Sequence, residues 1–324
     1  MPLGFEPADH AKNRPWPKSL SKASDKIERA EFPVHRKRTF TGLDMEAPLD
    51  SLKEFVNIQF VHIVEELIAE RAPKLMSRPR LFKLVKPALY RMLAYDAAVF
   101  LADTIKPLTG HVAFQRVARH INPRTAVVGL SNIPSKGACI LIANHPTGLA
   151  DGLAVFQAIR DRRPDHIFLA NADALRVIPH GEDIIIPVEW VKDKRNHTKT
   201  RETLLAVRDA IRAEKCIVIF PSGALAQMTW RGLVDRPWES SAAMIAKKYK
   251  VPVVPLNIKA RNSNLYYFFS WVNSELRDIT LFHELLNKKG QTFRLTFGET
   301  ITPDTLPKNA EDATAVIRKI VGEL

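Results

Sequence analysis

The sequence has few cysteines and no long hydrophobic run. Its two cysteines, Cys139 and Cys216, each lie in a short apolar segment that is typical of a buried strand. We therefore expect free core thiols in a reducing compartment rather than a disulfide or a metal pair. Nowhere do about 18 apolar residues follow one another, and the N-terminal segment lacks the apolar stretch of a signal peptide. We expect a cytoplasmic protein that does not cross a membrane.

The sequence also lacks the common motifs for binding nucleotides and metals. It contains no Gly-x-Gly-x-x-Gly, no phosphate-binding loop and no cluster of metal ligands, so we expect no metal and no bound cofactor. His283-Glu284 has no second histidine at the spacing of a zinc protease, and we interpret it as helix surface. The segment Pro221-Ser222-Gly223 is not the Gly-x-Ser-x-Gly of a serine hydrolase.

Positive charge is what the sequence has in excess. Its net charge is +13, and over half of this comes from residues 71–95, which hold seven basic side chains and no acid. Large apolar side chains are interleaved with them, as in a segment that lies on an anionic membrane surface. An amphipathic helix with a solvated basic face explains the pattern equally well. Nucleic acid is a disfavoured partner, because no reader motif and no spaced aromatic platform are present.

Apolar spacing divides the chain into three parts. Residues 1–48 are rich in Pro, Lys and Arg, which predicts a weakly ordered basic arm. Residues 49–122 show helical spacing, with a second helix expected after Pro87, and we interpret them as a membrane-facing helical layer. Residues 123–324 alternate short strands with helices near 150–162, 199–213, 238–249 and 309–323. This predicts an α/β domain with a mostly parallel sheet flanked by helices. The expected strands are TAVVGL, ACILIA, IFLA, DIIIPV, CIVIF, VPVVPLNI and TFRLTFGE.

The most informative segment runs from Ile140 to Gly152. It leaves a buried strand, turns through Asn144 and His145, and enters a helix near Asp151. A carboxylate six residues after the histidine can fold back onto its ring, set the tautomer and stabilise the imidazolium. No serine accompanies the pair, so the nucleophile would be a substrate hydroxyl. On these residues alone, a turn histidine followed by a helix cap is an equally good reading.

A second strand, in residues 217–224, also ends in Pro and Gly. Its sequence is IVIFPSGA. Ser222 and Gly223 can present hydroxyl and backbone donors to an anion or a developing oxyanion.

Together these segments resemble the lysophospholipid acyltransferase family, whose members esterify a lysolipid with an acyl chain from a thioester. Four blocks of the family appear in order: Asn144, His145 and Asp151; Ile186 to Val188 with a basic stretch after it; Phe220 to Gly223; and Val251 to Pro255. The resemblance implies that His145 is the general base and Asp151 its partner. It also implies a substrate site that includes Asn144, Gly148, Phe220, Pro221, Ser222 and Gly223. Arg195 and Arg261 are candidates for anionic head groups or donor phosphate, through bidentate contacts that lysine cannot copy.

Two departures from the family pattern point to a branch of it. One residue more than usual separates His145 from Asp151, and Ser222 replaces the usual glutamate. With the later stretch RNSNLYYFFSWVNSELRD, these features resemble the hemolysin-like branch that includes lyso-ornithine-lipid acyltransferases.

The branch implies a set of partners. A lyso-aminolipid is the expected acceptor, and lysophosphatidic acid is the alternative. Acyl-CoA or acyl carrier protein would be the donor, and the enzyme would lie on the inner face of the cell membrane, with residues 71–95 on the anionic surface. A lipid or thioester hydrolase and a non-catalytic membrane-binding protein also remain open.

Overall fold

The computed structural model describes residues 61–189, 197–230 and 232–324, all within one compact unit. The predicted arm at residues 1–48, the start of the helical layer and the candidate Arg195 lie outside the described residues.

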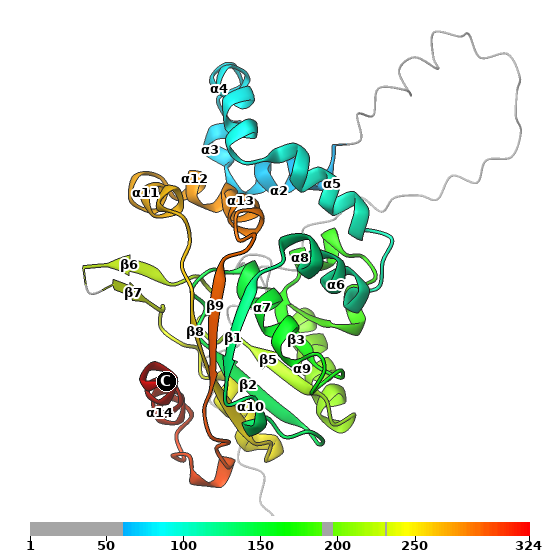
Figure 1. The fold of residues 1–324 in the computed structure, drawn as a ribbon, viewed down its shortest axis with the longest axis vertical. Helices are drawn as coiled ribbons and strands as arrows, with labels where there is room; N and C mark the ends of the chain where they lie inside the picture. Colours follow the sequence, from blue (N-terminus) through cyan, green and yellow to red (C-terminus); the bar gives the residue numbers. More distant parts are fainter. Residues whose placement is uncertain (1–60, 190–196, 231) are drawn as a thin grey trace, which may run out of the picture. The chain divides into compact units, whose positions relative to one another are not determined.

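A seven-stranded sheet forms the centre of the described part (Figure 1). In spatial order its strands are β1 (Arg124–Val128), β9 (Thr292–Phe297), β8 (Val253–Lys259), β2 (Cys139–Ala143), β5 (Cys216–Ile219), β3 (Ile167–Asn171) and β4 (Ile185–Val188). The last five are mutually parallel, whereas β1 and β9 run the opposite way because β9 pairs antiparallel with β8. The α/β class, the mostly parallel sheet and every predicted strand are confirmed.

Burial on both faces explains why these strands have continuous apolar sequences. In β2, Ile140 and Ile142 point to one core cluster, while Leu141 points to the other, and the whole strand is buried. Cys139 and Cys216 are directly paired in adjacent strands, and both are buried free thiols, as predicted from their apolar surroundings.

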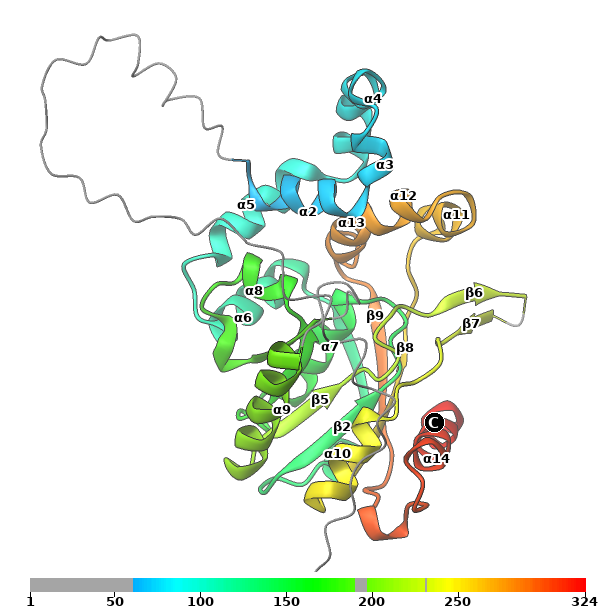
Figure 2. The ribbon, with the colours of Figure 1, turned by 180° about the vertical axis from the view of Figure 1, so that it is seen from behind.

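Helices cover the two faces of the sheet (Figure 2). One core cluster joins the sheet to α7 (Leu149–Ile159) and α6 (Gly110–Ile121). The other joins it to α9 (His197–Arg212), α10 (Ser241–Tyr249) and α14 (Ala310–Glu323). The four helices predicted among the strands are confirmed, with ends that shift by a few residues.

A further layer of helices lies beyond the carboxyl ends of the parallel strands (Figure 1). It combines two separate stretches of chain, one before the sheet and one inserted between β8 and β9. The first holds α2 (Ile63–Arg71), α3 (Pro73–Met76), α4 (Pro79–Met92) and α5 (Tyr95–Ile105). The second holds α11 (Asn264–Val272), α12 (Ser274–Ile279) and α13 (Leu281–Leu286). The two stretches share an apolar core, in which Ile279 is buried together with Val64 and Ile68.

Smaller elements complete the fold. They are α8 (Asp173–Val177), the hairpin of β6 (Gln227–Thr229) and β7 (Gly232–Val234), and short 3₁₀ turns at Leu130–Asn132, Gly181–Asp183 and Pro303–Thr305. The sequence did not predict the hairpin, because its strands are short and largely exposed.

The prediction that a helix begins after Pro87 is wrong. Helix α4 runs through this proline from Pro79 to Met92. Pro87 has no N–H to donate, so one helical hydrogen bond is lost, but the proline is exposed and water can satisfy the orphan carbonyl. Packing of Leu89 and Tyr90 in the helical core holds the segment in one helix.

Candidate active site

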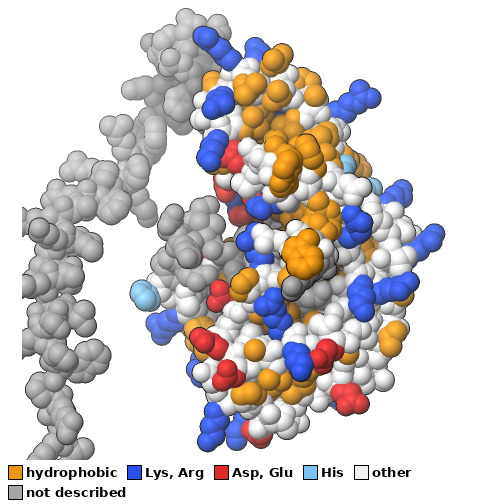
Figure 3. Space-filling view, turned by 90° about the vertical axis from the view of Figure 1, so that its left-hand side faces the viewer, with side chains coloured by type: hydrophobic (Ala, Val, Ile, Leu, Met, Phe, Trp, Pro, Cys, Tyr) orange, Lys and Arg blue, Asp and Glu red, His pale blue; other side chains and the backbone are white. Residues whose placement is uncertain are grey.

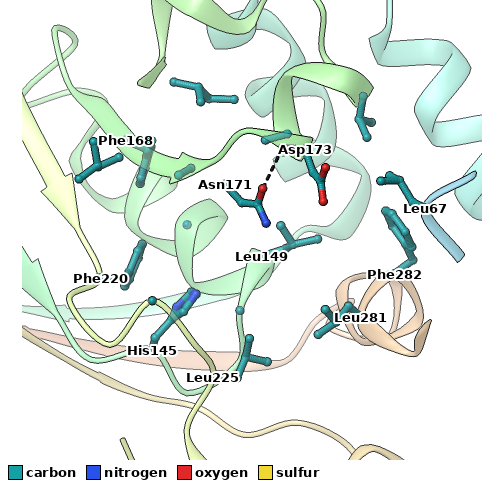
Figure 4. Close-up of a pocket in the computed structure, with 18 of the residues that line it drawn as sticks. Leu67, His145, Leu149, Phe168, Asn171, Asp173, Phe220, Leu225, Leu281 and Phe282 are labelled. Carbon is teal, nitrogen blue, oxygen red and sulfur yellow. Dashed lines mark hydrogen bonds between the residues drawn. The ribbon is translucent and has the colours of Figure 1, made fainter. Parts of the chain in front are cut away.

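The two sequence motifs meet at the carboxyl edge of the sheet. His145 follows β2 and Phe220 follows β5, which are adjacent parallel strands, so the loops that leave them lie side by side. The imidazole of His145 stacks on the Phe220 ring, with 4.3 Å between ring centroids and 25° between planes. Figure 4 shows both rings on one wall of a cavity. The aromatic contact fixes the plane of the imidazole.

Asp151 is both a helix cap and the partner of His145. It is fully buried in the first turn of α7, where one carboxylate oxygen accepts from the backbone N–H groups of Thr147 (2.8 Å) and Gly148 (3.0 Å). The other oxygen accepts from the Thr147 hydroxyl. Gly148 has φ +83° and ψ −127°, a conformation open essentially to glycine alone, and this allows the tight turn back to the histidine. The two readings of the motif are therefore compatible.

The histidine and the aspartate are held at contact distance. His145 Nδ1 lies 3.0 Å from Asp151 Oδ2, and the side chains are 17% and 0% exposed. This is ion-pair distance, although the ring orientation is not that of a formed hydrogen bond. Catalytic hydrogen bonds often align only when substrate is bound. The arrangement leaves Nε2 as the nitrogen that can exchange a proton with a substrate, while the buried carboxylate balances the charge behind it.

Two further side chains hold the backbone on either side of the histidine. The Asn144 amide donates to the Ile258 carbonyl (2.9 Å) and accepts from its N–H (2.7 Å), which ties the end of β2 to β8. Asp235, which the sequence did not reveal, accepts from the His145 N–H at 3.1 Å and from the Trp238 indole at 2.7 Å. Burial raises the pKa of Asp235 above its ordinary value, against the effect of these two hydrogen bonds.

The third block forms a self-contained turn beside the histidine. The Ser222 hydroxyl donates to the Ala224 carbonyl (2.8 Å), and the Gly223 N–H donates to the Phe220 carbonyl (3.0 Å). Both predicted oxyanion donors are thus engaged within the turn. Pro221 is buried beneath it, and Gly223 contributes to the cavity wall. The turn presents the Phe220 ring to His145.

The cavity in front of His145 has a volume of about 300 Å³. It adjoins a second, almost wholly apolar cavity of about 140 Å³ that extends between α5, α6 and α13. Residues that line both are Phe114, Leu149, Ala174, Val177, Ile185 and Phe282. The histidine therefore faces an apolar space that continues into the helical layer.

The first cavity also has polar groups that the sequence did not reveal. Arg71 of α2, Asn171 at the end of β3 and Asp173 at the start of α8 line it. Arg71 Nη2 donates to Asp173 Oδ2 at 3.0 Å. The sequence Asn171-Ala172-Asp173, directly after a predicted strand, could have indicated these groups, because functional groups gather at the strand ends of parallel sheets.

The two remaining candidates are Arg261 and Arg195. Arg261 is exposed, donates to the Asn264 side chain at 2.8 Å, lies over the Tyr267 ring at 5.7 Å, and is not among the lining residues of the cavity. Arg195 lies outside the described residues. Within the described ranges, no cluster of three or more His, Cys, Asp or Glu side chains is placed to hold a metal ion.

The interpretation of Glu284 as helix surface is wrong. Its side chain is 1% exposed, contacts the equally buried Lys288 at 2.8 Å, and accepts from the Ser263 N–H at 2.8 Å. Burial alone would raise the pKa of Glu284, but the Lys288 ammonium and the Ser263 hydrogen bonds hold it below its ordinary value. Glu284 belongs to α13, and these contacts join it to Ser263 at the start of α11, which a helical period alone does not predict.

Comparison with known proteins defines the class. Residues 124–259 match the acyltransferase family model, and this segment contains His145, Asp151 and the Phe220 to Gly223 block. The chain is an acyltransferase, and the matched segment holds the motifs that resemble the lysophospholipid acyltransferase family.

The chain is also similar to individual proteins. The lyso-glycine lipid O-acyltransferase of Phocaeicola vulgatus is 23% identical over 221 residues, which cover 66% of this chain and 77% of the relative. The protein of the same name from Bacteroides thetaiotaomicron is 20% identical over 260 residues, or 78% and 93% of the two chains. A solved structure, the 1-acyl-sn-glycerophosphate acyltransferase PlsC of Thermotoga maritima, aligns with a TM-score of 0.43 and 15% identity, over 80% of this chain and 95% of that one.

Proposed function

We propose that this acyltransferase transfers an acyl chain from a thioester to the hydroxyl of a lyso-aminolipid, with His145 as the general base. The observation that carries the proposal is the His145–Asp151 pair, whose imidazole reaches the cavity while its carboxylate is fully buried 3.0 Å behind. The described residues that line this cavity include no serine or cysteine, which suits a substrate that brings its own hydroxyl.

The reaction proceeds by direct attack. His145 Nε2 takes the proton of the acceptor hydroxyl as its oxygen attacks the thioester carbonyl. The new C–O ester bond forms, the C–S bond breaks, and the leaving thiolate takes the proton from the imidazolium. Asp151 holds the ring and balances its charge meanwhile. General-base assistance of this kind contributes typically about 10²- to 10⁴-fold, and holding two substrates together adds to it.

The shape of the cavities supports an acyl substrate. The wall beyond His145 is formed by Leu149, Phe282 and other apolar side chains, and the adjoining cavity between α5, α6 and α13 is lined by apolar residues. Burying a methylene group in such a space contributes about 0.8 kcal/mol. The acyl chain therefore extends from His145 into the helical layer in this proposal.

An amino-acid head group on the acceptor is supported by two observations. Ser222 stands where the family usually has a glutamate, and two similar proteins are named lyso-glycine lipid O-acyltransferases. We propose lyso-ornithine lipid as the acceptor, with lysophosphatidic acid as the alternative. Either acyl-CoA or acyl carrier protein is an acidic donor that suits the basic chain.

Peripheral binding to an anionic membrane completes the proposal. Of the seven basic residues between 71 and 95, five are exposed: Lys74, Arg78, Arg80, Lys83 and Arg91. Leu84 is 79% exposed among them, and Trp271 of the neighbouring helical stretch is 86% exposed. Figure 3 shows hydrophobic side chains gathered over the upper part of one face, with Lys and Arg around them. No described helix is long and apolar enough to cross a membrane.

Product analysis tests the proposal. The full chain is incubated with acyl-CoA or acyl-ACP and with lyso-ornithine lipid, lyso-glycine lipid or lysophosphatidic acid, and products are identified by mass spectrometry. A diacylated aminolipid supports the proposal. Free fatty acid that forms at the same rate with or without acceptor would indicate a thioester hydrolase, and phosphatidic acid as the main product would favour the alternative acceptor.

A further inference from the structure

We infer that Arg71, Asn171 and Asp173 form a subsite for a zwitterionic amino-acid head group, opposite the catalytic histidine. The inference rests on the proposed function and names the part of the chain that selects the acceptor. None of these three residues belongs to a family block found in the sequence.

The three side chains line the same cavity as His145. Arg71 ends α2, Asn171 ends β3 and Asp173 begins α8, so elements far apart in sequence bring them together. Figure 4 shows Asn171 and Asp173 across the cavity from His145 and Phe220, with Leu149 between them. Their setting is otherwise apolar, because most of the remaining wall consists of Leu, Phe, Val, Ile and Ala side chains.

Arg71 and Asp173 form an ion pair that is open to the cavity. Their side chains are 23% and 28% exposed, and Arg71 Nη2 lies 3.0 Å from Asp173 Oδ2. Arg71 Nη1 donates to the Leu67 carbonyl at 3.1 Å, which holds the guanidinium at the helix end. A guanidinium has five N–H donors in a fixed fork, so an incoming carboxylate can bind beside these contacts.

Asn171 provides a neutral donor beside Asp173. Its side-chain oxygen accepts from the Asp173 N–H at 2.9 Å, which fixes the orientation of the amide. The amide nitrogen consequently points into the cavity (Figure 4). It can donate to the amide carbonyl of an N-acylated amino acid or to its carboxylate.

The charge around the subsite favours a zwitterion over a phosphate. Arg176 contacts Asp173 at 3.3 Å and also pairs with Glu66 (3.1 Å) and Glu70 (2.9 Å). Two guanidinium groups therefore face three carboxylates, a balance of −1. A phosphate monoester would add a second strong negative charge to this acidic surrounding, whereas an amino-acid head group brings one carboxylate for Arg71 and one ammonium for Asp173. Each protein charge then keeps an opposite partner when the ligand binds.

Acceptor selectivity tests the inference in the full-length enzyme. We compare kcat/KM for lyso-ornithine lipid, which carries a carboxylate and an ammonium, with lyso-glycine lipid, which carries the carboxylate alone, in neutral detergent micelles. Asp173→Asn should lower the value about 10- to 100-fold for the first acceptor and less than about 3-fold for the second. Arg71→Lys keeps the charge but loses the fork, and should lower both about 10-fold.

Asp161→Asn is the matched control, because it makes the same chemical change at a carboxylate that is 92% exposed and lies outside both the cavity lining and the charge network of the subsite. It should change both acceptors less than about 2-fold. If Asp173→Asn lowers kcat/KM equally for both acceptors, the subsite is contradicted. A wild type that prefers lysophosphatidic acid would contradict it too. Neither result would contradict the acyltransferase reaction. Wild type that forms no ester with either aminolipid would overturn the proposed function itself. Thermal unfolding identifies any variant that has lost its fold, and Arg71→Lys then carries the test.

Discussion

The two walls of the main cavity are built in different ways. The wall that holds His145 comes from one short segment, in which β2, His145 and Asp151 follow one another between Cys139 and Asp151. The opposite wall joins Arg71 to Asp173 across 102 positions of sequence. The groups proposed for the chemistry are thus encoded locally, whereas the groups proposed to select the acceptor depend on how the helical layer packs against the sheet. Mutations in the two walls should therefore have different effects on the kinetics.

The largest effect is expected from a substitution of Asp151, in the wall that holds His145. Asp151→Asn keeps an oxygen to accept from the Thr147 and Gly148 N–H groups but removes the charge behind the imidazole. We expect kcat to fall about 10²- to 10⁴-fold while KM changes little, because substrate contacts remain. Steady-state kinetics and thermal unfolding measure the two properties. A variant that raises KM with unchanged kcat would contradict the role given to Asp151.

The packing of α13 in the helical layer should depend on the buried Glu284–Lys288 pair. Glu284→Gln leaves the Lys288 ammonium buried without its counter-charge, and we expect a loss of about 3–5 kcal/mol in the free energy of unfolding at neutral pH. Urea unfolding measures it, with the surface variant Glu70→Gln as the control, expected to change stability by less than about 0.5 kcal/mol.

The same pair predicts a pH dependence. The folded-state pKa of Glu284 lies below its ordinary value of 4.5, so its contribution to stability is present above that pH and is lost as the pH falls through the folded-state pKa. The stability difference between wild type and Glu284→Gln should therefore shrink in acid. A difference that stays constant down to the acid unfolding transition would contradict the assignment.

A smaller effect is expected from a substitution that tests whether the second, apolar cavity holds the acyl chain. Ala102 is buried on α5 and lines only the second cavity. Ala102→Leu should shorten the space and lower kcat/KM about 10-fold for a long acyl donor, while a short donor is used normally. Ala97→Leu, on the exposed side of the same helix, is the matched control. Equal losses for long and short donors would remove the cavity from the acyl path.

The smallest effect concerns the outer surface of the helical layer. Lys83 is exposed on α4, whereas Lys86 is half-buried and contacts Glu65 at 2.6 Å. Lys83→Gln should weaken binding to anionic vesicles about 5-fold at low salt, because one cation near the surface contributes about 1 kcal/mol. Lys319→Gln, an exposed lysine of α14, should leave vesicle binding unchanged. Equal weakening in both variants would indicate a nonspecific effect of net charge.

The sequence predicted the sheet well, for a physical reason. Strands such as β2 are buried on both faces, so their apolar runs stand out from the helices between them. The contact of Asp151 with His145 was predictable because the two residues are close in sequence. The exposed hairpin β6–β7 has no such pattern, and Asp235 reaches His145 only because this hairpin returns the chain to it.

The parts that the sequence did not reveal depend on long-range packing. Arg71 belongs to a basic stretch that suggested a membrane surface, yet it points inward and pairs with Asp173. Glu284 has the surroundings of a surface helix in sequence, yet its carboxylate is buried, where it pairs with Lys288 and accepts from Ser263 at the start of α11. Pro87 suggested a helix boundary, and tertiary contacts of Leu89 overrode that local signal.

The central claim is that His145 removes the proton of the acceptor hydroxyl. Its most direct test is the initial rate of ester formation from an acyl thioester and lyso-ornithine lipid, measured for wild type and His145→Ala at equal folded concentration. The account predicts that the variant keeps its fold and its binding to vesicles while the rate falls at least about 10²-fold. Ester formation at an undiminished rate in the folded variant would contradict it.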